Sequence, residues 1–582
     1  MINSLSILKL TGHLFFWVLF VFSLLFFKER HAFDAAHYLF EIISRESFFT
    51  AHGRLIGIVS QVLPLLGVYA GASLKSLMML YSFGDVLYYY ILFLIAAHVL
   101  KSNAATISVL LIVCLAVKFS FYCPVTELLQ AMALLPLLHQ ALLRMQRFQF
   151  HLIPLLLILI VFSHPLLFIL TAFVIASFIV QQKANLLSGQ NLFLLAAFFI
   201  ITATKFLLLD KYDYQKSFYP VVFNDYSNIS NLIQTDYLFS FFKMYAKENF
   251  LVIVLWIFTV VFLFTNKRFI SFTLALFAPL LFMVLIIVTH RFSAITNYSE
   301  RMLLPFAAMV ILSFGWCVQE LKSSFAKQFT VVIIACIISF RLWIIYDAAS
   351  PYTKRVAQIE GLIYQAWIQN SSKCIADERN LEYLPYALTG WSYPLESLLL
   401  SSINSKKSSV TVALKEEHYN RFAKQKLALN EIYKAQDSII NYSMLNPHYF
   451  SLPLTAYTFL NSSCSIDSAN DTSITINLSS KVNFKTENDY CYFHATVINS
   501  GKIVCSDVDS GYLMQVDAIS VNDSAYRDSR IIPFQTDIVK ELKQDLVFKN
   551  YGMKGKWIVS VFVIDKNKKV ITEPLYTEIN IN

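Results

Sequence analysis

Asp34, in the first polar segment of the chain, carries a carboxylate that suits two kinds of chemistry. It lies seven residues beyond an apolar run, 7–27, in a stretch rich in aromatic and basic residues, 28–40. A carboxylate at a membrane surface can act as a general base towards a hydroxyl group, or can bind a metal ion through its oxygen atoms. The alternative is a solvated loop acid. The following stretch, 41–49, is amphipathic and is expected to lie on a membrane interface.

A second acid, Glu127, follows shortly after Pro124 and Thr126. Pro124 cannot continue the preceding helix because it lacks a backbone N–H. Thr126 can cap the next helix, and Glu127 complements the dipole of that helix, so capping is the simpler interpretation. Glu127 is also the only acid in the stretch 86–209. We expect it on the same membrane face as Asp34, where the two carboxylates can meet.

Basic residues form a third group of candidates. His290, Arg291 and Arg301 flank the gap between two late apolar runs, and the guanidinium fork suits phosphate oxygens. The alternative for each arginine is a side chain that extends along the membrane interface to reach water. His164 precedes a proline between two apolar runs, where a histidine is more often a helix-end partner than a catalyst, and Arg54 opens the apolar run 55–72.

The elements that must position these residues are membrane spans. Hydrophobic residues make up 57% of the chain and charged residues 15%, against about 45–50% and 25% in soluble domains. Since about 20 apolar residues cross a bilayer, eleven spans are expected at 7–27, 77–99, 104–120, 127–143, 152–163, 166–181, 192–208, 250–266, 269–289, 302–319 and 329–346. The fifth and sixth could instead be one long helix broken at His164. The run 55–72 is interpreted as interfacial or re-entrant.

Orientation follows from the excess of Lys and Arg in cytoplasmic turns. If the N-terminus lies inside, every short inner turn holds at least one cation, and residues 347–582 lie outside. The first run has no small-residue cleavage site and is expected to be a retained anchor in the cytoplasmic (inner) membrane. Four charged residues within the spans are expected near the outer edge, where long side chains extend to water, namely Asp85, Lys118, Lys205 and Arg341.

The second part of the chain differs from the first in its charge and in its expected secondary structure. Residues 1–346 carry 23 Lys and Arg against 13 Asp and Glu, a balance of +10, whereas 347–582 carry 24 against 25, a balance of −1. We therefore expect three parts: a transmembrane part, 1–346; an extracytoplasmic α/β segment, 347–465; and a β-sandwich, 466–582. Four cysteines of the outer part could form two disulfides or remain free thiols, with one pair the more favoured. They are Cys374, Cys464 and the favoured pair Cys491 and Cys505.

Several classes of function lack their sequence signals. The net charge of +9 belongs to the apolar part and is not a nucleic-acid footprint. The chain has no nucleotide-binding glycine motif, no zinc-protease motif and no serine-hydrolase motif. Charges at mid-membrane, which are typical of ion-coupled transport, are nearly absent.

The layout of 1–346 resembles the GT-C class of membrane glycosyltransferases, which includes the protein O-mannosyltransferases and the aminoarabinose transferases. Asp34 matches the acid of the first outer loop in that class, and Glu127 matches the second acid. The stretch from Arg301 to Pro305 is similar to the late Arg-to-Pro stretch. The class often carries a paired acid in the first loop, whereas this chain has Asp34-Ala35-Ala36, with a single acid at that position.

The resemblance implies a polytopic helical protein that transfers a sugar from a polyprenyl-phosphate donor to a glycan, lipid or protein acceptor on the outer face of the bilayer. Asp34 would be the general base, and Arg301, with Arg291 or His290, would hold the donor phosphate. Glu127 would orient the acceptor or bind a cation; a divalent metal is compatible with the residues but not required by them. Two alternatives remain: an enzyme similar to O-antigen ligases or polymerases, and a transporter or flippase.

Overall fold

The structure is a computed structural model with side chains described for most of the first 460 residues. It describes residues 4–115, 117–144, 151–182, 188–208, 234–289, 297–378, 381, 384, 390–420, 427–435 and 438–460, and the backbone of seven later strands. The chain divides into two compact units: one of residues 1–373, 383–412 and 425–456, and one of residues 374–382, 413–424 and 457–582. The three-part boundaries expected at 346 and 465 remain predictions.

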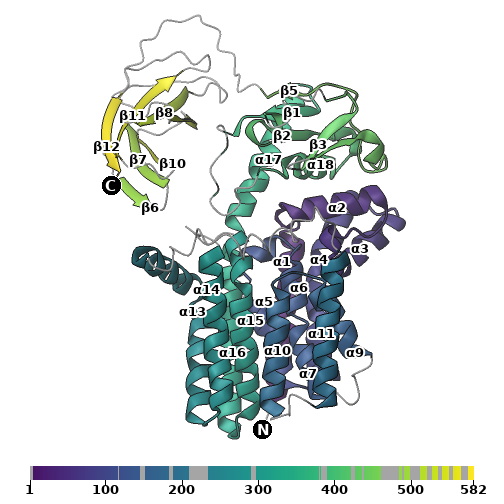
Figure 1. The fold of residues 1–582 in the computed structure, drawn as a ribbon. Coiled ribbons are helices and arrows are strands. Elements are labelled where there is room, and N and C mark those ends of the chain that lie inside the picture. Colours follow the sequence, from purple (N-terminus) through teal and green to yellow (C-terminus); the bar gives the residue numbers. More distant parts are fainter. Residues whose placement is uncertain are drawn as a thin grey trace, which may run out of the picture. The chain divides into compact units, whose positions relative to one another are not determined.

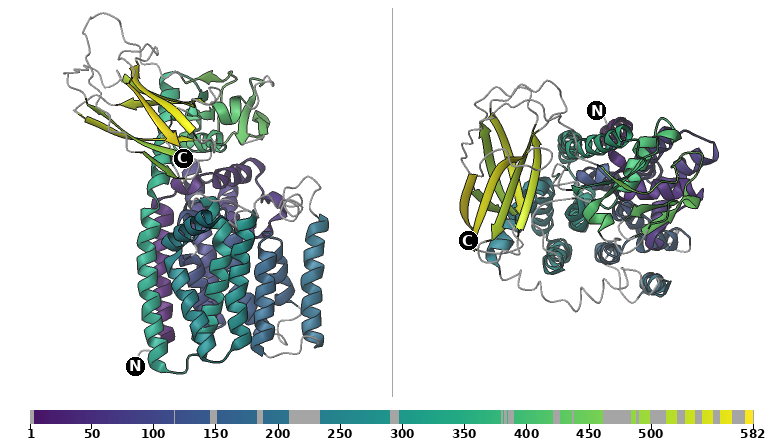
Figure 2. Two further views of the ribbon diagram at one scale, coloured as in Figure 1. Left: turned by 60° about the vertical axis from the view of Figure 1, so that its left-hand side comes forward. Right: turned by 90° about the horizontal axis from the view of Figure 1, so that it is seen from above.

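Helices make up most of the first unit (Figure 1). Their bounds are α1 (Ser4–Leu25), α2 (Asp34–Arg45), α3 (Ile58–Tyr69), α4 (Leu74–Leu94), α5 (Asn103–Leu115), α6 (Glu127–Met132), α7 (Leu135–Leu143), α9 (Leu152–Val161), α10 (Leu167–Gln182), α11 (Gly189–Leu208), α13 (Thr235–Thr265), α14 (Phe269–Thr289), α15 (Asn297–Glu320), α16 (Ser324–Asp347), α17 (Ser350–Ile368) and α18 (Tyr393–Ser402). Figure 2 shows the bundle end-on, with the long helices side by side.

Seven helices among the described residues are long and apolar enough to cross a membrane, as expected of a multi-pass membrane protein. They are α1, α4, α11, α13, α14, α15 and α16, the last continued by α17. The other four expected spans are shorter helices, so the expected number of eleven is not confirmed. The stretch 152–182 forms two helices, α9 and α10, rather than one.

The short helix α5 is continued by an irregular buried segment, 117–126. Thirteen residues of α-helix span about 20 Å, less than the ~30 Å of a bilayer core. The segment that follows holds one 3-10 turn, Phe119–Tyr122, all of it buried. Irregular backbone at such depth needs partners within the protein. Glu127 then begins α6, and Thr126 precedes it, but the Thr126 hydroxyl donates to Cys123 O at 2.9 Å rather than capping the helix.

Helix α2 lies beyond the end of the bundle at which α1 ends (Figure 1). Its apolar face is buried, as expected for an amphipathic helix, although it begins at Asp34 rather than near 41. Lys434 pairs with the buried carboxylate of Glu41, and Asn446 Nδ2 donates to Ile43 O at 3.0 Å. The segment 425–456 therefore fixes α2 in place.

Strands occur only beyond residue 372 in the described part of the chain. They are β1 (Lys373–Ala376), β2 (Thr411–Leu414), β3 (Glu431–Ala435), β4 (Ser438–Asn441), β5 (Thr458–Phe459), β6 (Phe484–Glu487), β7 (Tyr490–Ile498), β8 (Tyr512–Ser520), β9 (Arg527–Phe534), β10 (Glu541–Lys549), β11 (Gly555–Ile564) and β12 (Leu575–Ile581). The last seven form two antiparallel sheets, ordered β10-β7-β6 and β12-β11-β8-β9.

These two sheets fit the expected β-rich end of the chain, while their packing as a sandwich remains a prediction. The favoured disulfide is also untested, because Cys464, Cys505 and the side chain of Cys491 lie outside what the structure describes.

Candidate functional site

The first turn of α15 brings Arg301 to the beginning of α2. Arg301 Nη1 lies 3.2 Å from Asp34 Oδ2, and Arg301 Nη2 donates to Cys123 Sγ at 2.7 Å. The Asp34 side chain is 40% exposed and that of Arg301 is 20% exposed. Two of the residues that the sequence singles out therefore form an ion pair that a small molecule can reach.

Glu127 lies in the same region, held by one side chain of α2 and one from the segment that follows α2. Arg54 Nη1 is 3.2 Å from Glu127 Oε2, and the Tyr38 hydroxyl donates to Glu127 Oε1 at 2.7 Å. Burial, then the nearby carboxylate of Glu127 and more weakly that of Asp34, raises the pKa of Tyr38 well above its usual range. Tyr38 lies one helical turn along α2 from Asp34. The carboxylates of Asp34 and Glu127 therefore both lie near Tyr38.

His164 lies between α9 and α10, close to three cations. Burial lowers the pKa of His164 well below its usual value, and the nearby charges of Arg54, Lys205 and Arg301 lower it further. At neutral pH this imidazole is therefore uncharged. The structure thus places His164 near Arg54 and Arg301. Its Nδ1 also accepts the N–H of Leu166 at 3.2 Å, which is the helix-end role that the sequence favours.

Lys205 is a member of this group that the sequence interpretation missed. It was expected to extend to water, yet it is 5% exposed and its Nζ donates to Val161 O at 2.9 Å. The signal was present as a lone cation in the apolar run 192–208. An interior lysine of this kind is by default a functional candidate in a membrane protein.

Arg341 and Asp85 were also expected to lie near water, and that expectation is wrong for both. Each is 5% exposed. Arg341 donates to three carbonyl oxygens around the end of α5, those of Cys114, Leu115 and Val117, at 3.1, 3.3 and 2.8 Å. These bonds satisfy backbone acceptors that the helix end leaves open.

Glu300, the neighbour of Arg301, satisfies the backbone donors of the same buried segment. Its carboxylate accepts hydrogen bonds from the backbone N–H groups of Lys118, Phe119 and Ser120 at 3.2, 3.0 and 2.8 Å. Lys118, the fourth charge expected to extend to water, pairs with Glu248 at 2.9 Å. The first turn of α15 thus fixes the buried segment with one residue and reaches Asp34 with the next.

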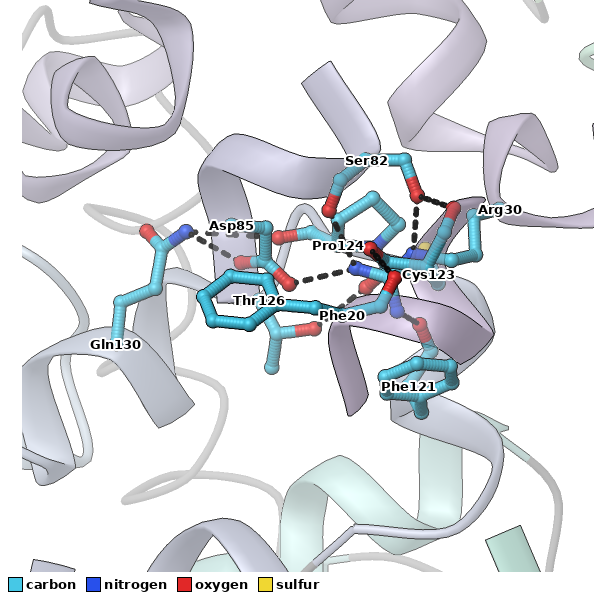
Figure 3. A network of polar contacts seen from close by, with 10 residues as sticks. Phe20, Arg30, Ser82, Asp85, Phe121, Cys123, Pro124, Thr126 and Gln130 are labelled. Carbon is cyan, nitrogen blue, oxygen red and sulfur yellow. Dashed lines mark hydrogen bonds and ion pairs between the residues drawn. The ribbon is translucent and has the colours of Figure 1, made fainter. Parts of the chain in front are cut away.

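Asp85 belongs to a buried network that joins the first loop to the segment before α6 (Figure 3). Arg30 Nη2 lies 2.9 Å from Asp85 Oδ2, and Arg30 Nε donates to Ser82 Oγ at 2.8 Å. Arg30 also donates to the carbonyl of Phe121, and Gln130 Nε2 donates to Asp85 Oδ1 at 3.3 Å. A buried ion pair of this kind is held by such additional bonds, because charges removed from water need every partner.

Some predicted members of the site cannot be placed. His290 and Arg291 lie outside the described residues. Within the described ranges no group of three or more His, Cys, Asp or Glu side chains is arranged to hold a metal ion. No family model, no curated protein and no solved structure matches the chain. Only the contacts within the chain therefore bear on what this site does.

Proposed function

We propose that the protein is a membrane glycosyltransferase of the GT-C kind, which moves a sugar from a polyprenyl-phosphate donor to an acceptor hydroxyl at the outer face of the cytoplasmic membrane. The observation that carries the proposal is the Asp34–Arg301 ion pair beside the Glu127–Arg54 pair at one end of an apolar helix bundle. At that end of the bundle the tail of a lipid can stay among the apolar helices while its phosphate and sugar reach the charged groups.

In this proposal Asp34 is the general base. Arg301 occupies Oδ2, so Oδ1 is the atom that accepts the proton of the acceptor hydroxyl. The hydroxyl oxygen forms a bond to C1 of the sugar as the bond from C1 to the phosphate oxygen breaks. Polyprenyl phosphate leaves with that electron pair.

The balance of charge around the site favours a phosphate ligand. The cations of Arg54, Arg301 and Lys205 outnumber the carboxylates of Asp34 and Glu127 by one, and a sugar phosphodiester carries one negative charge. The two guanidinium groups can each offer paired N–H donors to phosphate oxygens.

The other predicted residues have roles at the edge of this reaction. Neutral His164 adds a hydrogen-bonding group without adding charge. Glu127 is held by Arg54 and Tyr38 and would orient the acceptor. Arg291 and His290 remain predicted members of the phosphate clamp.

The test uses full-length protein in lipid nanodiscs with polyprenyl-phosphate mannose and polyprenyl-phosphate glucose, each radiolabelled in the sugar, and cell-envelope extract as the source of acceptor. We expect the wild type to move label from the lipid into the acceptor fraction. Asp34→Asn should lower that rate by about 100-fold or more, as loss of a general base does, without lowering the amount of protein in the membrane.

The matched control is Glu46→Gln, since Glu46 ends the same helix, is exposed, and accepts a hydrogen bond from Asn446 Nδ2 at 3.0 Å that Gln can keep. It should transfer sugar at the wild-type rate. Undiminished transfer by Asp34→Asn would contradict the role of Asp34, and transport of the intact lipid without transfer of sugar would favour a flippase.

A further inference from the structure

The residue before Asp34 adopts a backbone conformation that amino acids with a side chain rarely take. Phe33 has φ 59° and ψ −124°, and the N–H of Ala35 donates to Ala32 O at 3.3 Å. These values describe a type II′ turn with Phe33 at its first corner, a position that glycine usually fills. Asp34, the second corner of this turn, is also the first residue of α2. The direction of the Asp34 side chain thus depends on a corner that the sequence does not favour locally.

Phe33 is held in this conformation through its backbone. Its N–H donates to Glu396 Oε1 at 3.0 Å, although Glu396 lies 363 positions further along the chain, in α18. Glu396 is 4% exposed, so this bond has little competition from water. A conformation with positive φ persists only where its surroundings determine it strongly.

The ring of Phe33 is held by the same group. Arg355 of α17 donates to Glu396 through Nε and Nη2, both at 2.8 Å, in a two-pronged ion pair. The Arg355 guanidinium also lies 4.6 Å from the centre of the Phe33 ring. Arg355 and Phe33 are 1% and 7% exposed. One buried ion pair therefore fixes both the N–H and the side chain of the corner residue.

We infer that Arg355 and Glu396 are positioning residues, which hold the Phe33 corner and so aim the Asp34 carboxylate at Arg301; this inference rests on the proposed function. No hydrogen bond or ion pair of Arg355 or Glu396 to Asp34 is found among their described contacts, so they act through Phe33. Without them Phe33 relaxes towards negative φ, and the Asp34 carboxylate turns away from the Arg301 guanidinium.

A second ion pair between the same segments supplies the matched control. Lys28 Nζ lies 2.7 Å from Glu360 Oε1, which joins the first loop to α17 just as Arg355 does. Its side chains are 37% and 46% exposed, and the pair lies outside the contacts given for Phe33. If a general tie between loop and helix mattered, Glu360→Gln would have the same effect as loss of Glu396.

The experiment compares three full-length variants with the wild type. Glu396→Gln keeps an oxygen acceptor for the Phe33 N–H. The double variant Arg355→Met with Glu396→Leu removes the acceptor and leaves no unpaired buried charge, which protects folding. Glu360→Gln removes only the exposed pair. Hydrogen exchange of the backbone amides of residues 33–36 reports the turn, and the transfer assay reports kcat and KM.

We expect the double variant to speed exchange at 33–36 by about 10-fold, the contribution of one ordinary hydrogen bond, and to lower kcat by about 10-fold or more with KM unchanged. Glu396→Gln keeps the acceptor but leaves Arg355 without a counter-charge, so it should change both quantities less than the double variant does. Glu360→Gln should change neither. Equal effects from Glu360→Gln, or unchanged exchange in the double variant, would overturn the inference. If exchange responds as expected but the wild type transfers no sugar, the proposed function fails while the control of the Asp34 backbone stands.

Discussion

Arg301 and Asp34 lie 267 positions apart in the sequence, and their side chains meet with Nη1 of Arg301 3.2 Å from Oδ2 of Asp34. The contact joins the first turn of α15 to the first turn of α2, so it depends on how two distant helices are placed. Glu300, one residue earlier, anchors that turn of α15 to the buried segment after α5. The geometry of the site therefore depends on the side chains of both Glu300 and Arg301.

Arg301→Lys is expected to lower kcat/KM for sugar transfer by about 10- to 100-fold, because a lysine ammonium cannot replace a planar fork that contacts Asp34 and Cys123 with separate nitrogens. The measurement is the transfer assay at equal amounts of membrane protein. Arg268→Lys is the control, since Arg268 pairs with Glu320 at 3.6 Å and both are nearly half exposed. Wild-type kcat/KM in Arg301→Lys would show that charge alone is needed.

Glu300→Gln should lower the stability of the protein by about 1–3 kcal/mol. The two carboxylate oxygens accept hydrogen bonds from three backbone N–H groups, whereas an amide has only one oxygen that can accept. Thermal unfolding in detergent, followed by tryptophan fluorescence, measures the change. Glu248→Gln breaks only the partly exposed pair with Lys118 and should cost less than about 1 kcal/mol. A smaller effect at 300 than at 248 would contradict the role given to the buried segment.

Gly315→Ala should destabilise the protein by about 1–3 kcal/mol, because the added methyl group would lie 2.4 Å from Ser108 Oγ and 3.0 Å from Ala104 O, where α15 packs on α5. Gly361→Ala in α17 has no heavy atom within 4 Å of the added carbon, and should stabilise by up to about 1 kcal/mol through helix propensity. The two unfolding temperatures are compared directly. Opposite shifts from those expected would refute the close approach of α5 and α15.

The buried His31 makes stability depend on pH. Burial, assisted by the charge of Arg30, lowers the pKa of His31 from 6.5 to about 4. Between these values the unfolded chain binds more protons than the folded chain, so stability should fall as pH falls from about 6.5 to 4, by at most about 3 kcal/mol. Above pH 6.5 this residue should contribute no pH dependence.

His31→Asn tests this dependence, because the Asn side-chain N–H can replace the bond from Nδ1 of His31 to Phe27 O. The unfolding temperature of the variant should fall less than that of the wild type as the pH is lowered through this range. Parallel curves for the two proteins would mean that His31 does not titrate as a buried group.

Much of this molecule could be predicted from local sequence. Apolar length predicted the seven long helices, because the bilayer demands a continuous apolar run whatever the neighbouring helices do. The strand-like character of the later part of the chain predicted that strands lie there, and in the described residues they occur only beyond 372. Asp34, Glu127 and Arg301 stood out because polar residues next to apolar runs are few, and few candidates are easily chosen.

What only the tertiary structure decided is which of those residues meet, and which others hold them. Glu396 reaches Phe33 across 363 positions, and Arg341 satisfies carbonyls of the segment after α5 across more than 220. The sequence predicted that the side chains of Lys205 and Asp85 extend to water. In the structure Lys205 instead donates to a backbone carbonyl of α9, and Asp85 pairs with the side chain of Arg30. The periodicity and composition of a segment indicate which of its residues are suited to water and which to an apolar environment. The partners of a buried charge depend on helix packing, which no single segment of sequence contains.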